Sequence, residues 1–159
     1  MRLVGIIDTD TINYKKISMV LEFPICKNFK CDKECGQQVC QNCTLATAPN
    51  IEIDIGKLVV RYCNSSISQS LCCQGLEPFD SWEDLKALIH AIRAVGIKDD
   101  IVIYTGYTKC EIADKVEWLK KFSNIIVKFG RYIPNQKPHY DEVLGVDLAS
   151  DNQYAERIS

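Results

Sequence analysis

Several features are scarce or missing in this sequence, and each excludes a class of protein. No stretch is long and apolar enough to span a bilayer, which argues against a membrane protein. The net charge of −2 gives no general attraction to nucleic acid or to an anionic membrane surface. A phosphate-binding glycine-rich loop is lacking, so nucleotide hydrolysis is disfavoured. Only two histidines occur, His90 and His139, and neither is expected to be a ligand or a general base.

What is present fits an ordinary globular chain. The 159 residues are 47% apolar and 25% charged, so we expect one domain spanning residues 1–159 with a normal core. The first residues lack the apolar segment and cleavage site of a signal peptide, and we therefore expect a cytoplasmic protein.

Cysteine is the residue in excess. Five of the nine cysteines fall within residues 26–43, at Cys26, Cys31, Cys35, Cys40 and Cys43. Disulfides are rare in the cytosol, and an odd number of cysteines cannot pair fully within one chain. Clustered thiolates select zinc, copper(I) or an iron–sulfur cluster, so metal or cluster binding is expected. The other four, Cys63, Cys72, Cys73 and Cys110, lie in periodic segments and are expected to be small buried residues.

Strand and helix patterns alternate along the chain. Strands are predicted at residues 17–24, 70–74, 100–104 and 124–129. Helices are predicted around residues 55–62, 81–95 and 112–122, with Ser81 as N-cap and Gly96 as the C′ residue. A loop is expected at 136–140 and a short helix at 152–158, and Lys120, Lys121 and Lys128 are interpreted as a solvated face. This order predicts an α/β fold with a mainly parallel sheet.

Three unusual segments follow predicted strands. They are the cysteine-rich segment, Gly75-Leu76-Glu77-Pro78 and Tyr104-Thr105-Gly106-Tyr107. Because ligands bind at the carboxyl ends of parallel strands, we expect all three to meet at one edge of the sheet.

The ordered set of segments resembles the radical S-adenosylmethionine (radical SAM) activating proteins of anaerobic ribonucleotide reductase. The tail from Leu148 to Gln153 is similar to the Asn-Gln segment near the end of many of them, so the resemblance covers nearly the whole chain. It implies an incomplete parallel (βα) barrel, a [4Fe–4S] cluster and S-adenosylmethionine (SAM). In that family one-electron cleavage of SAM gives a 5′-deoxyadenosyl radical, which removes a hydrogen atom from a glycine of a large reductase. The implied partners are that reductase and an electron donor such as flavodoxin or ferredoxin, with no nucleic acid and no membrane.

The resemblance also implies site residues. The family holds its cluster by C-x3-C-x2-C, whereas four residues separate Cys26 from Cys31 here, one more than in the family. For the third ligand Cys35 is closer in spacing, but Cys40 fits the local pattern better, and we favour Cys40. The other implied positions are the SAM-binding residues Gly75, Glu77 and Pro78, and the adenosine or substrate border at Thr105 and Gly106.

Leu76 replaces a family glycine at the SAM-binding segment. An acidic side chain or a backbone carbonyl there suits the ammonium group of SAM. Two other classes of protein remain open at this point. One is a different radical SAM enzyme that acts on a small molecule or peptide. The other is a non-catalytic iron–sulfur or zinc protein, with Cys31, Cys35, Cys40 and Cys43 as a four-thiolate zinc site.

Overall fold

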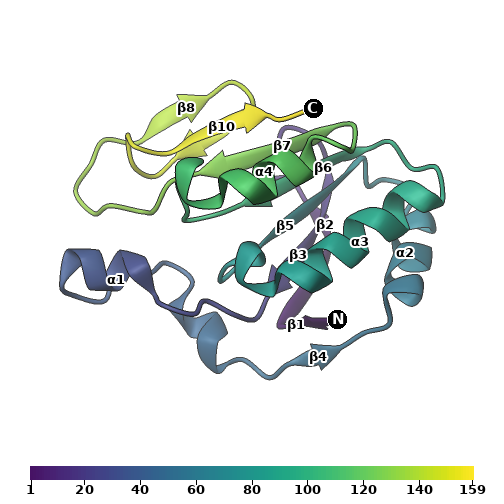
Figure 1. The fold of residues 1–159 in the computed structure, drawn as a ribbon, viewed down its shortest axis with the longest axis horizontal. Coiled ribbons are helices and arrows are strands. Elements are labelled where there is room, and N and C mark those ends of the chain that lie inside the picture. The colour runs from purple at the N-terminus through teal and green to yellow at the C-terminus, as the bar shows by residue number, and fades with distance from the viewer.

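A six-stranded sheet forms the centre of the computed structural model, which describes residues 1–159 (Figure 1). The strand order is β10-β7-β6-β5-β3-β2, and the four middle strands are parallel. The strands are β2 (Gly5–Asp10), β3 (Ser18–Phe23), β5 (Ser70–Gly75), β6 (Asp100–Tyr104), β7 (Ile125–Phe129) and β10 (Tyr154–Arg157). The parallel strands are the four that the sequence predicted.

Both edges of the sheet are antiparallel. Strand β2 pairs with β3 and strand β10 pairs with β7, and the two edges do not pair with each other. The predicted helix at residues 152–158 is wrong, because this segment forms β10, with Tyr154 opposite Phe129. A short segment takes its conformation from the edge on which it docks, which local sequence does not reveal. The incomplete barrel stays a prediction.

Three helices cover one face of the sheet, namely α2 (Ile55–Cys63), α3 (Trp82–Ala94) and α4 (Ala113–Leu119). Odd-numbered strand residues such as Met19, Leu71 and Ile101 pack against their apolar faces. Gly96 has φ +82° just after α3, as predicted for a C′ residue. Ser81 precedes the helix but makes no capping hydrogen bond, because the chain enters α3 from a short 3₁₀ helix, η2 (Pro78–Ser81).

The opposite face packs on loops and a hairpin. Even-numbered residues such as Val20, Cys72 and Val102 contact a second apolar cluster that includes Tyr14 and Leu144. The hairpin consists of β8 (His139–Asp141) and β9 (Val146–Leu148), so the predicted loop at 136–140 runs into a strand. A further two-stranded pair joins β1 (Arg2–Leu3) and β4 (Ile51–Glu52). No helix has both the length and the apolar character needed to cross a membrane.

The cysteine-rich segment crosses the molecule beyond the carboxyl end of β3 (Figure 1). It contains α1 (Lys30–Cys35) and a 3₁₀ helix, η1 (Cys43–Thr47), and neither buries a residue. Polar contacts rather than a hydrophobic core therefore position this segment.

The remaining cysteines divide in two. Cys72 and Cys73 are fully buried in β5, as predicted. Cys63, the last residue of α2, and Cys110, in the 3₁₀ helix η3 (Cys110–Ile112), are exposed, so the prediction of burial is wrong for both. Helical periodicity marks a face but not how far the ends of a helix extend beyond the core.

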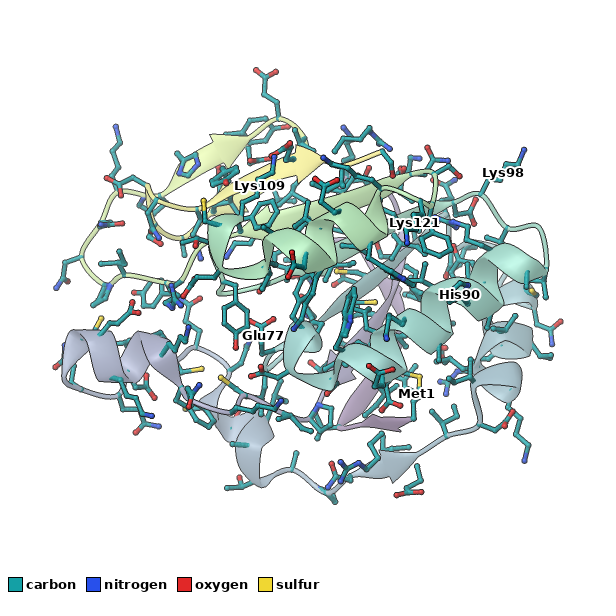
Figure 2. All side chains as sticks on the ribbon, viewed as in Figure 1. Met1, Glu77, His90, Lys98, Lys109 and Lys121 are labelled. Atoms are coloured by element: carbon teal, nitrogen blue, oxygen red, sulfur yellow. The ribbon has the colours of Figure 1, made fainter.

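His90 lies within α3 (Figure 2). Its ring packs edge-on against Trp118 and Phe122. These contacts give the histidine a packing role on the helical face, away from the carboxyl ends of the strands.

Candidate iron–sulfur site

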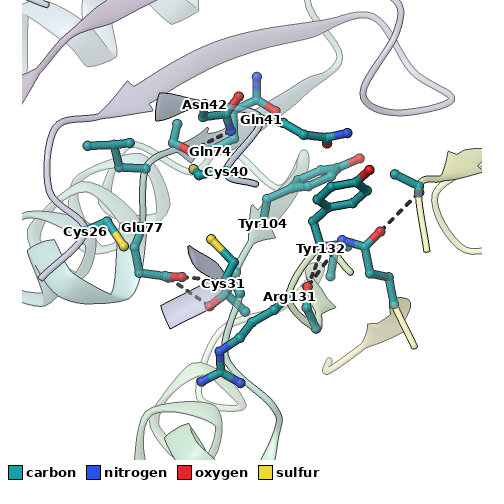
Figure 3. A pocket seen from close by; sticks show the side chains of 18 of the residues that line it. Cys26, Cys31, Cys40, Gln41, Asn42, Gln74, Glu77, Tyr104, Arg131 and Tyr132 are labelled. Carbon is teal, nitrogen blue, oxygen red and sulfur yellow. Dashed lines mark hydrogen bonds between the residues drawn. The ribbon is translucent and has the colours of Figure 1, made fainter. Parts of the chain in front are cut away.

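A cavity of about 300 Å³ opens at the carboxyl ends of β5, β6 and β7 (Figure 3). The cysteine-rich segment forms one wall, and residues after β7 and from β9 form another. All three strand-end segments that the sequence singled out line this cavity. Their expected convergence is therefore present in the structure.

Three of the five clustered cysteines face the cavity. Cys26, Cys31 and Cys40 line it, whereas Cys35 and Cys43 do not. Figure 3 shows the Cys26, Cys31 and Cys40 side chains around the space beside Glu77. The placement favours Cys40 over Cys35 as the third ligand, and Cys35, although included among the sequence candidates, ends α1 outside the cavity.

Asp32 brings the second and third of these thiols together. Its Oδ1 atom accepts hydrogen bonds from the backbone N–H groups of Val39 and Cys40, both at 2.7 Å. It also accepts from Cys31 Sγ at 3.7 Å. One carboxylate oxygen thus closes the segment into a loop and sets Cys40 next to Cys31.

Two of the three thiols, those of Cys26 and Cys31, lie in surroundings that disfavour the charged thiolate. Burial, followed by the charges of Cys40 and Asp32, raises the pKa of Cys31 to about 12. Burial also raises the pKa of Cys26. Thiolates are the ligands of metals, and here only a bound cation would compensate the cost of forming them.

Ion pairs dock α1 onto the rest of the site. Lys30 Nζ lies 2.8 Å from Glu111 Oε1, and Arg131 Nη2 lies 2.6 Å from the same oxygen. Arg131 Nε also lies 3.4 Å from Glu34 Oε1. The hydrogen bond from Arg131 is the main reason that the pKa of Glu111 is well below its usual value. This cluster fixes the cysteine-bearing helix over the ends of β6 and β7.

Glu77 links two strand ends instead of facing the cavity with a free carboxylate. It is 4% exposed. Its Oε1 accepts from Thr105 Oγ1 at 2.8 Å and from the backbone N–H of Phe79 at 3.1 Å. Its Oε2 accepts from the Gly106 N–H at 2.9 Å. Burial raises the pKa of Glu77 to about 7, although these donors favour the ionised form.

Gly75 has a structural requirement of its own. Its φ is +103°, and a Cβ atom there would lie 2.6 Å from the backbone nitrogen of Phe23. Its carbonyl accepts a hydrogen bond from Asn42 Nδ2 at 2.8 Å. Asn42 therefore ties the cysteine-rich segment to the end of β5, and Pro78 beside it is buried as the first residue of η2.

Asp80 forms a second tie. Its Oδ2 accepts from the backbone N–H of Lys27, next to Cys26, at 2.8 Å. Its Oδ1 accepts from the Tyr107 hydroxyl, also at 2.8 Å. Asp32, Asp80 and Arg131 were not identified from the sequence, because their roles depend on contacts that residue spacing does not show.

Lys128 is the clearest correction. It was interpreted as part of a solvated face, but it is 7% exposed and lines the cavity. Its Nζ atom donates to the Gly130 carbonyl at 2.8 Å. In a parallel strand buried on both faces, a lysine at the carboxyl end points into the site, and only sheet register reveals that.

These residues have the donor chemistry of a thiolate-bound iron–sulfur cluster. Three soft sulfur donors border the same cavity, Cys31 from α1 and Cys26 and Cys40 from the loops on either side of it. Nowhere do three or more His, Cys, Asp or Glu side chains converge on a point that would hold one ion. Cys35 and Cys43, two of the four thiols of the zinc alternative, do not line the cavity.

The comparison with protein families agrees with this chemistry. No curated protein and no solved structure is significantly similar to the chain. Residues 25–153, most of the chain and nearly the whole site, match the family described as "4Fe-4S single cluster domain". With its three thiols around one cavity, the chain belongs to the 4Fe-4S single cluster domain family.

Proposed function

We propose that the protein is a radical SAM activase that generates a glycyl radical on an anaerobic ribonucleoside-triphosphate reductase. The observation that carries the proposal is the meeting of Cys26, Cys31 and Cys40 with the ends of β5 and β6 at one cavity. A cluster held by three cysteines leaves one iron open to a ligand, and the adjoining strand ends supply polar backbone for that ligand. An incomplete barrel with SAM at its mouth accommodates this arrangement.

The roles of individual residues follow from their contacts. Cys26, Cys31 and Cys40 hold the cluster, and Asp32 and Asn42 fix the segment that carries them. The carboxylate of Glu77 already accepts three internal hydrogen bonds. Backbone carbonyls at the end of β5, rather than the Glu77 carboxylate, are therefore proposed to bind the ammonium group of SAM. Thr105 and Gly106 form the border toward the adenosine or the substrate.

Cys26, Cys31 and Cys40 would hold the cluster. The cluster would pass one electron from a donor such as flavodoxin or ferredoxin to SAM, and breaking of the sulfonium C–S bond would release methionine and supply the 5′-deoxyadenosyl radical that removes a hydrogen atom from the partner's glycine. Such a radical must be shielded from water. Ile12 lines the cavity with 76% of its surface exposed, which suits an apolar contact with a large partner that completes the wall.

The test is anaerobic reconstitution with iron and sulfide, followed by SAM cleavage with and without a cognate reductase. We expect slow, uncoupled cleavage alone, and an electron paramagnetic resonance signal of a glycyl radical when the reductase is added. A protein whose reductase-dependent signal never forms, although cluster and SAM cleavage are present, would not be an activase.

A cavity of about 300 Å³ is also large enough for a small substrate, which favours a second candidate. This is a radical SAM enzyme that acts on a small molecule or peptide. Fast coupled turnover with such a substrate and no partner would select it.

A further inference from the structure

A second hollow, here called the outer hollow, lies on the other side of the chain that carries Cys26. It measures about 390 Å³, and its lining includes Pro24, Ile25 and Lys27. The residue between them, Cys26, lines the cavity of the iron–sulfur site instead. Asp80 lines both spaces. The outer hollow and the cavity are therefore separated by one short stretch of chain that contains a proposed cluster ligand.

This dividing stretch is irregular chain between β3 and α1, and hydrogen bonds hold it in place. The Lys27 N–H donates to Asp80 Oδ2 at 2.8 Å, and Asp80 Oδ1 accepts from the Tyr107 hydroxyl at 2.8 Å. Covalent bonds join Lys27 to Cys26, so an electron can pass from the outer hollow to the proposed ligand without leaving the chain. The cavity mouth offers no such entry once a large partner closes it, as the proposed function requires.

Trp82 gives the outer hollow an aromatic surface, and cations surround it. Lys86 Nζ lies 5.7 Å and Lys115 Nζ lies 5.5 Å from the ring centroid of Trp82. Arg2 and Lys27 line the outer hollow, are exposed and form no ion pair. Aromatic and arginine side chains are enriched where proteins bind one another.

The acidic residues of the outer hollow are already engaged. Glu83 pairs with Lys86 at 2.9 Å. Asp84 Oδ2 accepts from the Arg2 N–H at 3.1 Å, and both oxygens of Asp80 accept hydrogen bonds. The basic side chains around the outer hollow outnumber these three acids and are Arg2, Lys27, Lys86 and Lys115.

We infer that the outer hollow binds the electron-donor protein, through an acidic surface around the redox group of that donor. This inference rests on the proposed function. Arg2 and Lys27 would attract the acidic surface, and Trp82 would pack against an apolar part of it. In the transfer, one electron leaves the reduced flavin or iron–sulfur centre of the donor and enters the cluster, and no bond forms or breaks. Acidic side chains are exposed on the opposite wall of the cavity, at Asp147 and Asp151, so an acidic donor is disfavoured there.

The experiment measures contact with flavodoxin in the absence of SAM. Surface plasmon resonance gives the affinity of the reconstituted protein for oxidised flavodoxin. Stopped-flow absorbance gives the rate at which flavodoxin oxidises the dithionite-reduced cluster, because electrons cross the same contact in both directions. Both are measured at ionic strengths of about 0.01 M and about 1 M, where the screening length is about 30 Å and about 3 Å.

The test variant is Arg2→Glu/Lys27→Glu, and the control is Lys98→Glu/Lys121→Glu, which changes the net charge equally. Lys98 and Lys121 are exposed and precede β6 and β7, so they lie at the amino end of the sheet, away from the outer hollow (Figure 2). At low ionic strength we expect the test variant to bind flavodoxin about tenfold more weakly and to exchange electrons about tenfold more slowly. The difference should vanish at high ionic strength, and oxidation of the cluster by a small uncharged quinone should not change. Arg2→Glu alone, which leaves the residue beside Cys26 intact, should act in the same direction with full cluster content.

Equal affinities and rates for the test and control variants would overturn the inference. Normal contact with flavodoxin, together with loss of the reductase-dependent glycyl radical in the test variant, would also overturn it and assign the outer hollow to the reductase. A protein that exchanges electrons with flavodoxin as expected but never cleaves SAM would keep the docking site and lose the proposed function.

Discussion

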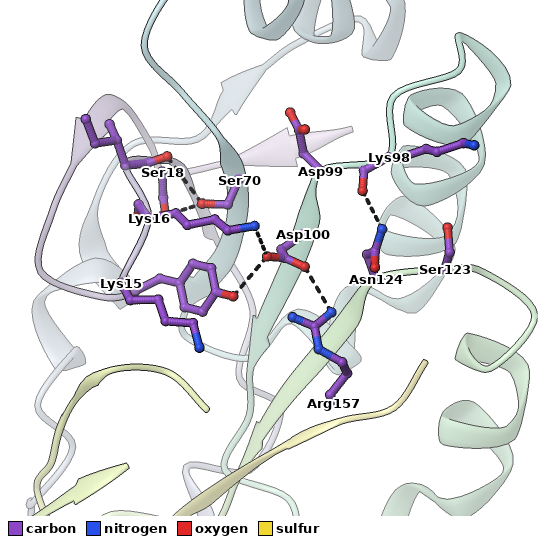
Figure 4. A network of polar contacts seen from close by, with 12 residues as sticks. Lys15, Lys16, Ser18, Ser70, Lys98, Asp99, Asp100, Ser123, Asn124 and Arg157 are labelled. Carbon is purple, nitrogen blue, oxygen red and sulfur yellow. Dashed lines mark hydrogen bonds and ion pairs between the residues drawn. The ribbon is translucent and has the colours of Figure 1, made fainter. Parts of the chain in front are cut away.

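The two ends of the parallel sheet differ in whether their buried charged side chains have partners of opposite charge. At the amino end, Asp100 begins β6 and is 4% exposed. Its carboxylate accepts from Tyr14 Oη at 2.9 Å, from Lys16 Nζ at 2.5 Å and from Arg157 Nη1 at 3.0 Å (Figure 4). At the carboxyl end, Glu77 has no cationic partner and Lys128 has no anionic one.

This difference suggests a structural role for the charges at the amino end and a binding role for those at the carboxyl end. At the amino end the chain neutralises its own charges, and nearby Ser18 and Ser70 share a hydrogen bond of 2.8 Å. At the carboxyl end, the Glu77 carboxyl group and the Lys128 ammonium group are buried without a partner of opposite charge, and the thiols beside them are half-buried. Such incomplete compensation is typical of a site that binds a ligand. Substitutions at the two ends should therefore act on different measurements.

The largest expected effect is on cofactor content at the carboxyl end. Cys26→Ala, Cys31→Ala and Cys40→Ala should each lose nearly all of the iron and the visible absorption that dithionite bleaches, because each removes a proposed ligand. Cys35→Ala and the exposed Cys63→Ala serve as controls and should retain the cluster. Full cluster content in Cys40→Ala together with loss in Cys35→Ala would reverse the assignment of the third ligand.

The next effect is on stability at the same end. Glu77→Ala leaves the Thr105 hydroxyl and the N–H groups of Phe79 and Gly106 without their acceptor. We expect the free energy of unfolding to fall by about 2–3 kcal/mol, measured by urea denaturation of the apoprotein. If the variant were as stable as wild type, the interpretation of Glu77 as a link between strand ends would be wrong.

At the amino end, Asp100→Asn should lower the free energy of unfolding by about 1–2 kcal/mol, because Lys16 and Arg157 are partly solvated and can be hydrated after the change. Cluster content and SAM binding should not change. A loss of cluster in this variant would show that the two ends are coupled rather than independent.

The pH dependence of stability should have opposite signs at the two ends. At Asp100, burial would raise the pKa, but hydrogen bonds from Lys16, Arg157 and Tyr14 outweigh it and the pKa is lowered. Its stabilisation is present above the unfolded-state pKa and is lost as the pH falls through the folded-state value. Glu77 has a raised pKa of about 7, so ionising it lowers stability as the pH rises from the ordinary value toward 7.

Denaturation of the apoprotein across pH 3–8 tests both signs. Asp100→Asn should remove the fall in the free energy of unfolding at acidic pH. Glu77→Gln should reduce the fall in the free energy of unfolding as the pH rises toward 7. If neither substitution changed how the free energy of unfolding depends on pH, that dependence would come from other groups.

The smallest effect is expected at the rim. Tyr107→Phe removes the hydrogen bond to Asp80 and should cost about 1 kcal/mol of stability. Cluster content should stay near the wild-type value. The yield of glycyl radical on the reductase should fall by a larger fraction than the cluster content does. If radical formation were unaffected, Tyr107 would lie outside the contact with the partner.

The sequence by itself determined the parallel core and the kind of chemistry. Runs such as Asp100-Ile101-Val102-Ile103-Tyr104 are buried on both faces only as central strands, and the spacing of apolar residues fixed the three covering helices. Five clustered cysteines in a chain without other metal-ligand patterns indicated thiolate ligation. The convergence of three segments at one edge followed from the direction of parallel strands alone.

Only the tertiary structure decided which groups meet. Cys40 rather than Cys35 reaches the cavity because Asp32 closes a loop around it, and no spacing rule contains that contact. Lys128 is buried because β7 lies inside the sheet, and Tyr154 to Arg157 form a strand because an edge was available. Local sequence determines the periodicity of apolar residues and the kinds of side chain available. The pairing register of the strands and the contacts between distant segments decide which of these side chains are buried. Burial in turn decides which charged groups remain without a partner in the protein.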